Sequence, residues 1–409
     1  MTRPAAFVFR DNLAALATCR ELGHAGIDVV VLDARPGPAA HSRFARFVEV
    51  PAYYEQPAAW VSAVCELARN YSEAPVLFPT EDAALLVCDR YHAELSTALR
   101  FPHPAPGVAS AALDKRRLYE AGAEVGLAVP RFYEPGDLRV ASEIADGGEW
   151  LAKPVCRYWF DEERERVRTF LSLTGGSKAI AGDPRTGAER ITAAGFPAII
   201  QERIPGAFED LVSVGLALDA HGELLGSFCA AKHCEYPEPF GDGLIVEAIA
   251  PRPELVEASI ALLRRLGHWG ICDVEFKRDP RDGRYKLLDA NPRVWLWMGL
   301  GARCGIPLAL TAYLLAIGQP PAPRPARAIR TRGPVWVSPR GAAAFLARSY
   351  RPSRHGLGLP MRLTVGALRT ILGDLRTFRD PIYIHPSAWS EILAAAKRRA
   401  VSSATKRSL

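Results

Sequence analysis

A predicted β-hairpin spanning residues 272–293 contains the residue pattern with the clearest chemistry. Its two strands flank a polar turn at 279–283, and Glu275 and Asp289 lie at equal distances from the centre of that turn. Antiparallel pairing would set these carboxylates opposite each other, and the two-residue period of a strand puts Asn291 on the same face as Asp289. Facing carboxylates repel unless a cation lies between them, and such oxygen ligands suit Mg²⁺. The pattern therefore predicts a magnesium site open to phosphate oxygens, and the alternative is a solvent-facing hairpin.

Three lysines earlier in the chain are candidates for contacts with phosphate. Lys153 follows the apolar residues 150–152 and would end a strand, while Lys115 would begin a helix. Lys178 follows a Gly-Gly-Ser segment at 175–177, whose backbone amides could also face an anion. Solvated surface lysines and an ordinary turn are the alternative interpretation.

The apolar stretch 198–204 becomes polar and then turns at Pro205 and Gly206, as expected for a hinge strand near 201–206. Such a strand offers backbone groups to the edge of a purine, and Glu209 or Asp210 could accept hydrogen bonds from ribose hydroxyls. A buried strand that ends in a Pro-Gly turn would explain the pattern equally.

The elements that must position these residues begin with alternating strands and helices. Apolar runs at 5–9, 27–33 and 76–78, with a helical pattern at 13–24, predict a small parallel sheet in a domain of residues 1–108. The first turn, 10–12, lacks the glycines of a dinucleotide-binding fingerprint, so we do not expect a dehydrogenase.

Prolines around 319–325 mark a second boundary, so we expect domains at 109–320 and 321–409. The last segment contains 17 Lys/Arg against 3 Asp/Glu, a net charge of +14, and since the whole chain is +6, residues 1–320 carry −8. An acidic body disfavours nucleic-acid binding. The basic segment predicts a partly helical extension that packs on the enzyme, and peripheral contact with an acidic surface or membrane is the alternative.

Composition indicates a cytoplasmic globular enzyme. The eight cysteines form no CxxC pair, and the longest apolar run is too short to cross a bilayer. Cys229, His233 and Cys234 lack a fourth ligand at the spacing of a zinc site.

The order of these segments resembles the ATP-grasp superfamily, in particular its carboxylate-amine ligases and the large chain of carbamoyl phosphate synthase. The resemblance spans about residues 5–318, and its most specific part is 289–293, Asp-Ala-Asn-Pro-Arg. The other matching segments are 41–51, 79–82, 114–115, 153–154, 201–206 and 273–276. The resemblance implies a mixed α/β and α+β fold, in which a Rossmann-like pre-ATP-grasp domain precedes two ATP-grasp subdomains that close over ATP.

The resemblance also implies roles for individual residues. The implied ATP contacts are Lys115 and Lys153 to phosphates, Gln201, Glu202 and the Ile204 backbone to adenine, and Glu209 or Asp210 to ribose. Lys178 stays a candidate ATP contact because of its place after the Gly-Gly-Ser segment. Glu275, Asp289 and Asn291 would bind Mg²⁺, with Mn²⁺ as the alternative metal. Arg293 and Lys153 would act in catalysis, with Arg293 over the transferred phosphate and the acyl intermediate.

In the implied reaction, ATP activates a small-molecule carboxylate as an acyl phosphate, which is then passed to an amine. Similar ligases are commonly dimers, so the resemblance also implies a homodimer. A thiol or carbamate acceptor, or a nucleotide-sensing binding module, is the alternative. Trp295 and Trp297, with residues 157–159, could shape the acceptor pocket, and packing of a helix is the alternative for the tryptophans. Residues 155–159 replace the glycine-rich loop of similar enzymes, so the contacts of a lid with ATP do not follow from the resemblance.

Overall fold

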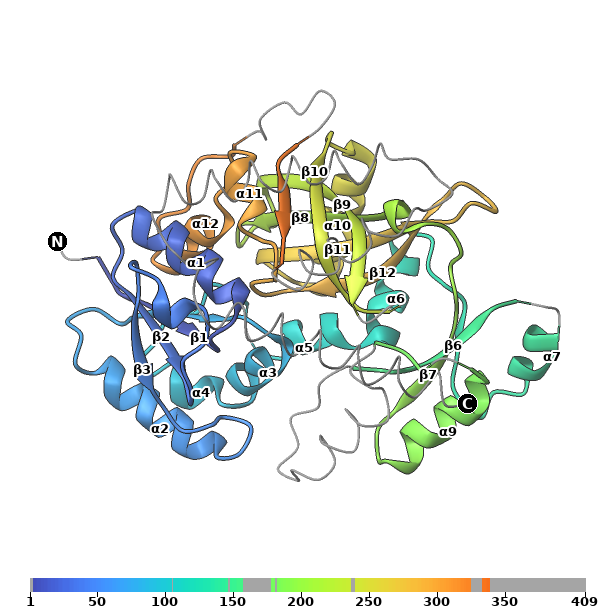
Figure 1. Ribbon diagram of the computed structural model, residues 1–409, viewed down its shortest axis with the longest axis horizontal. Helices are drawn as coiled ribbons and strands as arrows, with labels where there is room; N and C mark the ends of the chain where they lie inside the picture. Colours follow the sequence, from blue (N-terminus) through green and yellow to red (C-terminus); the bar gives the residue numbers. More distant parts are fainter. Residues whose placement is uncertain are drawn as a thin grey trace, which may run out of the picture.

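The computed structural model contains three β-sheets, each with its own helices (Figure 1). The parallel sheet lies at the left of Figure 1, the six-stranded sheet at the upper centre and the three-stranded sheet at the right. The described residues are 3–104, 106–145, 148–156, 178–180, 182–236, 240–324 and 333–338. The predicted basic extension therefore lies almost wholly outside the described residues.

The N-terminal sheet is parallel, with the order β3-β2-β1-β4. Its strands are β1 (Ala6–Phe9), β2 (Val29–Asp33), β3 (Arg46–Glu49) and β4 (Val76–Pro79). The helices are α1 (Leu13–His24), η1 (Ala39–His41), α2 (Pro57–Ala68), α3 (Asp82–Arg90) and α4 (His92–Leu95). Every residue of β1, β2 and β4 is buried, as expected where helices cover both faces of a parallel sheet. The predicted strand-helix-strand opening is confirmed.

The three-stranded sheet is antiparallel, with the order β5-β7-β6. Its strands are β5 (Phe132–Tyr133), β6 (Trp150–Pro154) and β7 (Ala198–Glu202), and its helices are α7 (Arg139–Ala145) and α9 (Pro184–Ala193). Ala152 and Ile200 pack with Ile191 of α9 in a small core. This core fixes the strand that contains Lys153.

The six-stranded sheet is antiparallel, with the order β12-β11-β8-β9-β10-β13. Its strands are β8 (Leu211–Leu218), β9 (Leu224–Tyr236), β10 (Asp242–Ile249), β11 (Gly270–Arg278), β12 (Tyr285–Asn291) and β13 (Val335–Val337). The remaining helices are α5 (Val108–Leu113), α6 (Lys115–Glu124), η2 (Phe208–Asp210), α10 (Pro253–Leu266), α11 (Leu300–Arg303) and α12 (Leu308–Ala316). Helices α6 and α10 pack on this sheet through Leu118 and Leu262, which contact the cluster of Val214 and Val274.

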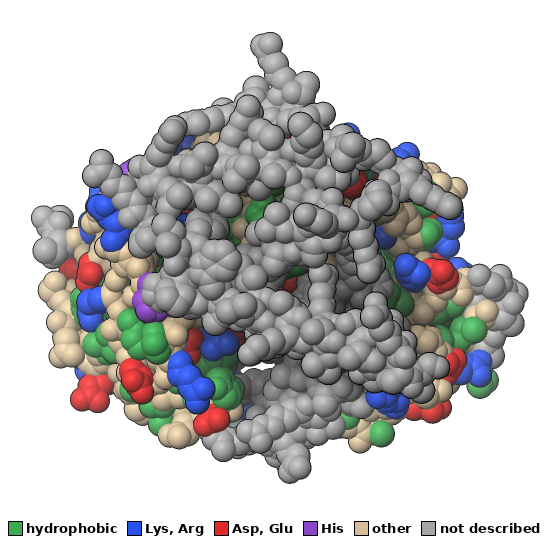
Figure 2. Space-filling view, viewed as in Figure 1, with side chains coloured by type: hydrophobic (Ala, Val, Ile, Leu, Met, Phe, Trp, Pro, Cys, Tyr) green, Lys and Arg blue, Asp and Glu red, His purple; other side chains and the backbone are tan. Residues whose placement is uncertain are grey.

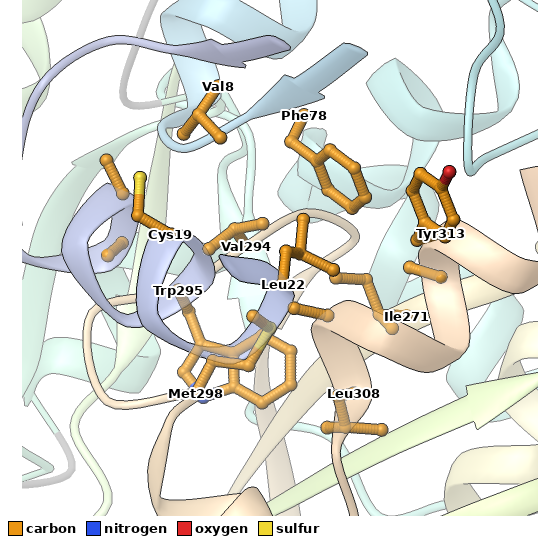
Figure 3. Packing of buried hydrophobic residues seen from close by; sticks show 14 of the residues in the cluster. Val8, Cys19, Leu22, Phe78, Ile271, Val294, Trp295, Met298, Leu308 and Tyr313 are labelled. Atoms are coloured by element: carbon orange, nitrogen blue, oxygen red, sulfur yellow. The ribbon is translucent and has the colours of Figure 1, made fainter. Parts of the chain in front are cut away.

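A hydrophobic core joins the parallel sheet to the six-stranded sheet. It brings Leu22 of α1 and Phe78 of β4 together with Ile271 of β11, Trp295 and Tyr313 of α12 (Figure 3). The hydroxyl of Tyr313 donates a hydrogen bond of 2.6 Å to the carbonyl of Pro4. The N-terminal domain is thus held against the sheet that contains the predicted hairpin.

The visible described surface has a mixed charge. In Figure 2, Lys/Arg and Asp/Glu side chains alternate over the coloured parts of both flanks. Within the described residues, none of the helices combines the length and the apolar composition that crossing a membrane requires.

Candidate active site

The hairpin of β11 and β12 places four oxygen-bearing side chains on one face. Glu275 pairs with Asp289 and Asp273 pairs with Asn291, and the register shifts only after Glu275. The side chains of residues two apart in a strand share a face. The predicted pairing of Glu275 with Asp289 is therefore present, and Asp273 is a fourth polar member that we did not predict.

Each of the two paired carboxylates contacts a lysine from another element. Lys232 of β9 donates to Glu275 Oε2 at 2.7 Å, and Lys115 at the start of α6 contacts Asp289. Burial would raise the pKa of Glu275, but the ammonium groups of Lys232 and Lys178 outweigh burial and lower this pKa. At Asp289, burial again acts to raise the pKa, but the nearby charges of Lys115 and Lys178 outweigh burial and lower this pKa to about 2. Both acids are thus held in the charged form.

Helix α6 delivers Lys115 to this position through its N-terminus. Asp114 is the N-cap residue, and its carboxylate accepts hydrogen bonds of 2.9 and 3.2 Å from the backbone N–H groups of Arg116 and Arg117. Such capping satisfies backbone groups at the start of a helix and fixes where the helix begins. Lys115 is therefore the first helical residue, as predicted.

Asp273 is the least solvated acid of this face, with 1% of its surface exposed. Its Oδ2 accepts from Asn291 Nδ2 at 3.2 Å, and its Oδ1 has no hydrogen-bond partner among the described residues. Burial and the neighbouring Glu275 raise the pKa of Asp273 well above its ordinary value. A nearby divalent cation would remove this penalty, since opposite charge favours the ionised form. The position of Asp273 two residues before Glu275 was the signal that could have identified it.

The donor set of this face fits Mg²⁺, because it consists of carboxylate and amide oxygens and includes the unpartnered Asp273 Oδ1. Among the described residues, however, no three His, Cys, Asp or Glu side chains already converge as a metal site. Lys115 and Lys232 lie on the carboxylates instead. Metal binding by Glu275 and Asp289 would therefore require the two ammonium groups to move, and phosphate oxygens are natural new partners for them.

Lys153 lies in β6 beside this face. Its ammonium donates a hydrogen bond of 3.3 Å to Gln201 Oε1, which also accepts from the Tyr119 hydroxyl at 2.9 Å. Burial, reinforced by the positive charge of Lys115, lowers the pKa of Lys153 to about 8. Lys178 approaches from the other side and forms an ion pair of 3.5 Å with Asp242. Several cations thus gather where a polyphosphate would relieve their mutual repulsion.

Two cavities meet at the paired carboxylates. The first cavity, of about 290 Å³, lies between the three-stranded and six-stranded sheets, and the second, of about 220 Å³, lies between the six-stranded sheet and the N-terminal domain. Lys153, Lys178, Glu275 and Asp289 line both. The first cavity is also lined by Leu151, Gln201, Arg203, Ile204, Gly206, Ala207, Phe208, Leu211, Glu235, Phe240, Gly241, Lys277 and Leu288. A ligand that spans both cavities would pass the acid pair.

The structure separates Gln201 from Glu202. Gln201 faces the first cavity, but the side chain of Glu202 contacts Arg281 at 2.7 Å and Lys286 at 3.6 Å, away from the residues that line this cavity. Alternation along β7 explains the difference, because adjacent side chains of a strand point to opposite faces. Only the backbone of Glu202 remains available to a ligand there.

Glu209 and Asp210 do not belong to the lining of the first cavity. Glu209 Oε1 lies 3.6 Å from His233 Nδ1, and Asp210 accepts from the backbone N–H of Ala207 at 2.9 Å. The Asp210 carboxylate therefore stabilises the turn after the hinge strand. This arrangement gives no support to the predicted ribose contacts.

Arg293 connects the hairpin to the N-terminal domain. Its Nε donates to Asp82 Oδ1 at 2.5 Å and its Nη2 to Asn291 Oδ1 at 3.2 Å. Asp82 was not among the predicted site residues, because its partner lies 211 positions later in the chain. The guanidinium of Arg293 is therefore oriented by both domains.

Trp295 and Trp297 belong mainly to the core, with 2% and 3% of their surfaces exposed and their ring centroids 5.7 Å apart. Both also border the second cavity. Packing thus accounts for most of their surface, but neither residue lies in a helix as the alternative interpretation expected. Residues 157–159 and 175–177 lie outside the described residues.

Comparisons with known proteins agree with this geometry. The family model described as carbamoyl-phosphate synthase L chain, ATP binding domain, matches residues 248–322, which include the hairpin. The large chain of carbamoyl phosphate synthase from Methanobrevibacter smithii is 37% identical over 66 residues, covering 16% of this chain and 6% of that protein. The chain thus matches only a small part of the length of these curated relatives.

Solved structures match a much larger part of the chain. The L-amino acid ligase from Bacillus licheniformis matches with a TM-score of 0.56 and 16% identity, covering 78% of this chain and 75% of that one. An ADP complex of N5-carboxyaminoimidazole ribonucleotide synthetase matches with a TM-score of 0.59 and 16% identity, covering 85% and 87%. At this level of identity the likeness shows the fold. The matched family model and the carbamoyl phosphate synthase relatives cover only part of this chain, and with the likeness in fold they agree with the resemblance to the ATP-grasp superfamily.

Proposed function

We propose that this protein is an ATP-dependent ligase that activates a carboxylate as an acyl phosphate and joins it to an amine. The observation that supports this most directly is the pair of Glu275 and Asp289, placed with Lys153 and Lys178 where the two cavities meet. ATP would occupy the first cavity, with its γ-phosphate at the acid pair. The second cavity would then hold the carboxylate and the amine.

The apolar walls of the first cavity suit a nucleobase. Leu151, Ile204, Leu211 and Leu288 would pack against the base, and Gln201 is a polar group able to orient it. Strand β7 ends at Glu202, two residues before Ile204, so backbone N–H and C=O groups of this segment could meet the base edge, as the family resemblance implies. The lining of this cavity therefore supports a nucleotide better than a purely polar ligand.

The residues at the acid pair would perform the first half-reaction. Mg²⁺ bound by Glu275 and Asp289, together with Asn291, would supply neutralisation of phosphate charge. A carboxylate oxygen attacks the γ-phosphorus, the bond from this phosphorus to the β-γ bridging oxygen breaks, and ADP leaves. Lys153 and Lys178 would bind the phosphate oxygens and keep the reactants in line.

The second half-reaction forms the amide. The amine nitrogen attacks the acyl carbon, the bond from this carbon to the phosphate oxygen breaks, and inorganic phosphate leaves with a proton. Arg293, held by Asp82 and Asn291, borders the second cavity and would neutralise charge on the intermediate. Exclusion of water by the packed domains would protect the acyl phosphate from hydrolysis.

The test measures phosphate release by the purified full chain with ATP, Mg²⁺ and a pool of N-acetyl amino acids and short aliphatic acids, with and without a second pool of amines and amino acids. We expect release that depends on an added amine, and a loss of about 10²- to 10³-fold in the Asp289→Asn variant. Glu257→Gln is the matched control, because Glu257 is exposed on α10. Turnover without any amine dependence would contradict the ligase proposal, and full activity of Asp289→Asn would contradict the site assignment.

A further inference from the structure

The second cavity has two unlike walls that the proposed reaction leaves unassigned. One wall comes from the ends of β1 and β4 and presents polar side chains, including Asn12, Thr80 and Glu81. The other wall comes from the segment after the hairpin and presents the apolar Leu296 between Trp295 and Trp297. A molecule that lies between them would contact an acid on one side and hydrocarbon on the other.

Of the other acids that line this cavity, four are paired with cations of the same cavity, and the fifth, Asp273, is hydrogen-bonded to Asn291. Asp82 contacts Arg293, and Asp242 contacts Lys178. Glu275 and Asp289 contact lysines that also line the cavity. The negative charge of each of these four acids is therefore balanced by a lysine or arginine that also lines the cavity.

Glu81 differs because its cation lies behind it. Glu81 Oε2 accepts from Arg10 Nε at 3.3 Å and Oε1 accepts from the Tyr53 hydroxyl, and neither Arg10 nor Tyr53 lines the cavity. Arg10 also pairs with Asp33 at 3.2 Å. The guanidinium of Arg10 thus pairs with the carboxylates of both Asp33 and Glu81. These three side chains together retain a net negative charge, which Glu81 presents to the cavity.

The backbone of this group is also held in an unusual conformation. Arg10 has a φ of 79°, in the left-handed region that residues other than glycine seldom occupy. Asp11 stabilises the loop after β2 by accepting backbone hydrogen bonds from Gly37, Ala39 and Ala40 at 2.6 to 2.9 Å. Glu81 itself is the N-cap residue of α3, and its carboxylate is held by Arg10 and Tyr53.

We propose that Glu81 binds the ammonium group of the acceptor, and that the acceptor is a primary amine with an apolar substituent lying against Leu296. A carboxylate oxygen has two acceptor sites, so Glu81 can accept from an ammonium while it keeps Arg10 and Tyr53. The inference rests on the proposed ligase function and adds to it the chemical class of the amine. Glu81 acts here as a specificity-determining residue.

The test separates activation of the carboxylate from use of the amine. Hydroxylamine is small and largely uncharged near neutral pH, so it traps an acyl phosphate as a hydroxamate without a need for ammonium binding. For each variant, kcat/KM for isobutylamine is divided by the rate of hydroxamate formation with the same carboxylate pool. We expect this ratio to fall about tenfold or more in Glu81→Gln, as for loss of a charged hydrogen bond, and to change little in Glu94→Gln, an exposed acid on α4.

A second variant and a second amine guard against a general structural effect. Glu81→Asp keeps the charge, so its ratio should lie between those of the wild type and Glu81→Gln. Methylamine lacks most of the apolar group, and we expect its kcat/KM in the wild type to be about tenfold lower than that of isobutylamine. No hydroxamate from the wild type would overturn the ligase function itself. Hydroxamate formation with an unchanged ratio in Glu81→Gln would overturn only the inference about the acceptor.

Discussion

The two cavities that meet at Glu275 and Asp289 are built by different means. The first lies between two antiparallel sheets and has several leucine and isoleucine side chains in its wall. The second lies between a hairpin and the strand ends of a parallel sheet, and several pairs of opposite charge line its wall. Packing against apolar walls suits a ligand common to many enzymes, whereas paired charges discriminate among substrates. We therefore expect substitutions of the residues that line both cavities to impair ATP binding and substrate use together. Substitutions in the second cavity should change which substrates are used.

The largest effect should come from Lys153, which lines both cavities. The Lys153→Met variant removes a buried ammonium that we propose binds phosphate, so kcat/KM for ATP should fall about 10²- to 10³-fold. Phosphate release under the conditions above measures this. Arg284→Met is the control, because Arg284 is exposed in the hairpin turn. Retained activity of Lys153→Met would mean that the boundary between the cavities does not bind phosphate.

The next largest effect should come from the core that holds the N-terminal domain in place. Leu22 is fully buried beside Phe78 and Ile271, so Leu22→Ala should lower the free energy of unfolding by about 2–5 kcal/mol. Because only the second cavity has a wall from this domain, KM for the amine should rise while the Kd for ATP stays within about twofold. Denaturant unfolding, amine kinetics and ATP titration give the three values. An equal rise in the Kd for ATP would show that the two cavities are not independent.

The sequence predicted the local parts of this site much better than the long-range parts. Pairing of Glu275 with Asp289 depends on a short hairpin, so counting residues from the turn was sufficient. The start of α6 at Lys115 was equally local, since Asp114 caps it. Asp82 and Lys232 reach the hairpin from distant strands and helices, and no spacing rule connects them to their partners.

Alternation within a strand explains why Gln201 lines the first cavity and Glu202 does not. Gln201 and Glu202 are neighbours in sequence, but β7 turns one toward the first cavity and the other toward Arg281. A sequence motif that resembles a family does not state which face of the strand each residue occupies. The parallel sheet was predictable because its buried strands are continuous apolar runs.

A smaller effect should appear in the pH dependence of nucleotide binding. Burial, with the nearby charge of Lys115, lowers the pKa of Lys153 to about 8, so the ammonium is present below pH 8 and is lost as the pH rises through this value. Bound phosphates favour the charged form, so the Kd for ATP should rise above pH 8 by up to about tenfold per pH unit. Titration calorimetry from about pH 7 to pH 9 measures this. Lys153→Arg stays charged throughout this range and should abolish the dependence, and a wild-type Kd independent of pH would contradict the assignment.

The smallest effect should come from Asp82, which contacts Arg293 rather than any proposed substrate atom. Asp82→Asn keeps the size of the side chain and removes its charge. The charged hydrogen bond from Arg293, which contributes about 1.5–3 kcal/mol, is replaced by a weaker one to the Asn oxygen. We expect kcat to fall about tenfold with the KM for ATP unchanged, since Arg293 borders the second cavity and does not line the first. A merely structural role would lower stability and leave the kinetics of the folded enzyme alone. A double-mutant cycle with Arg293→Lys distinguishes these cases, because two side chains that act together give losses that do not add. Additive losses would mean that Asp82 does not position Arg293, and that the two walls of the second cavity work separately.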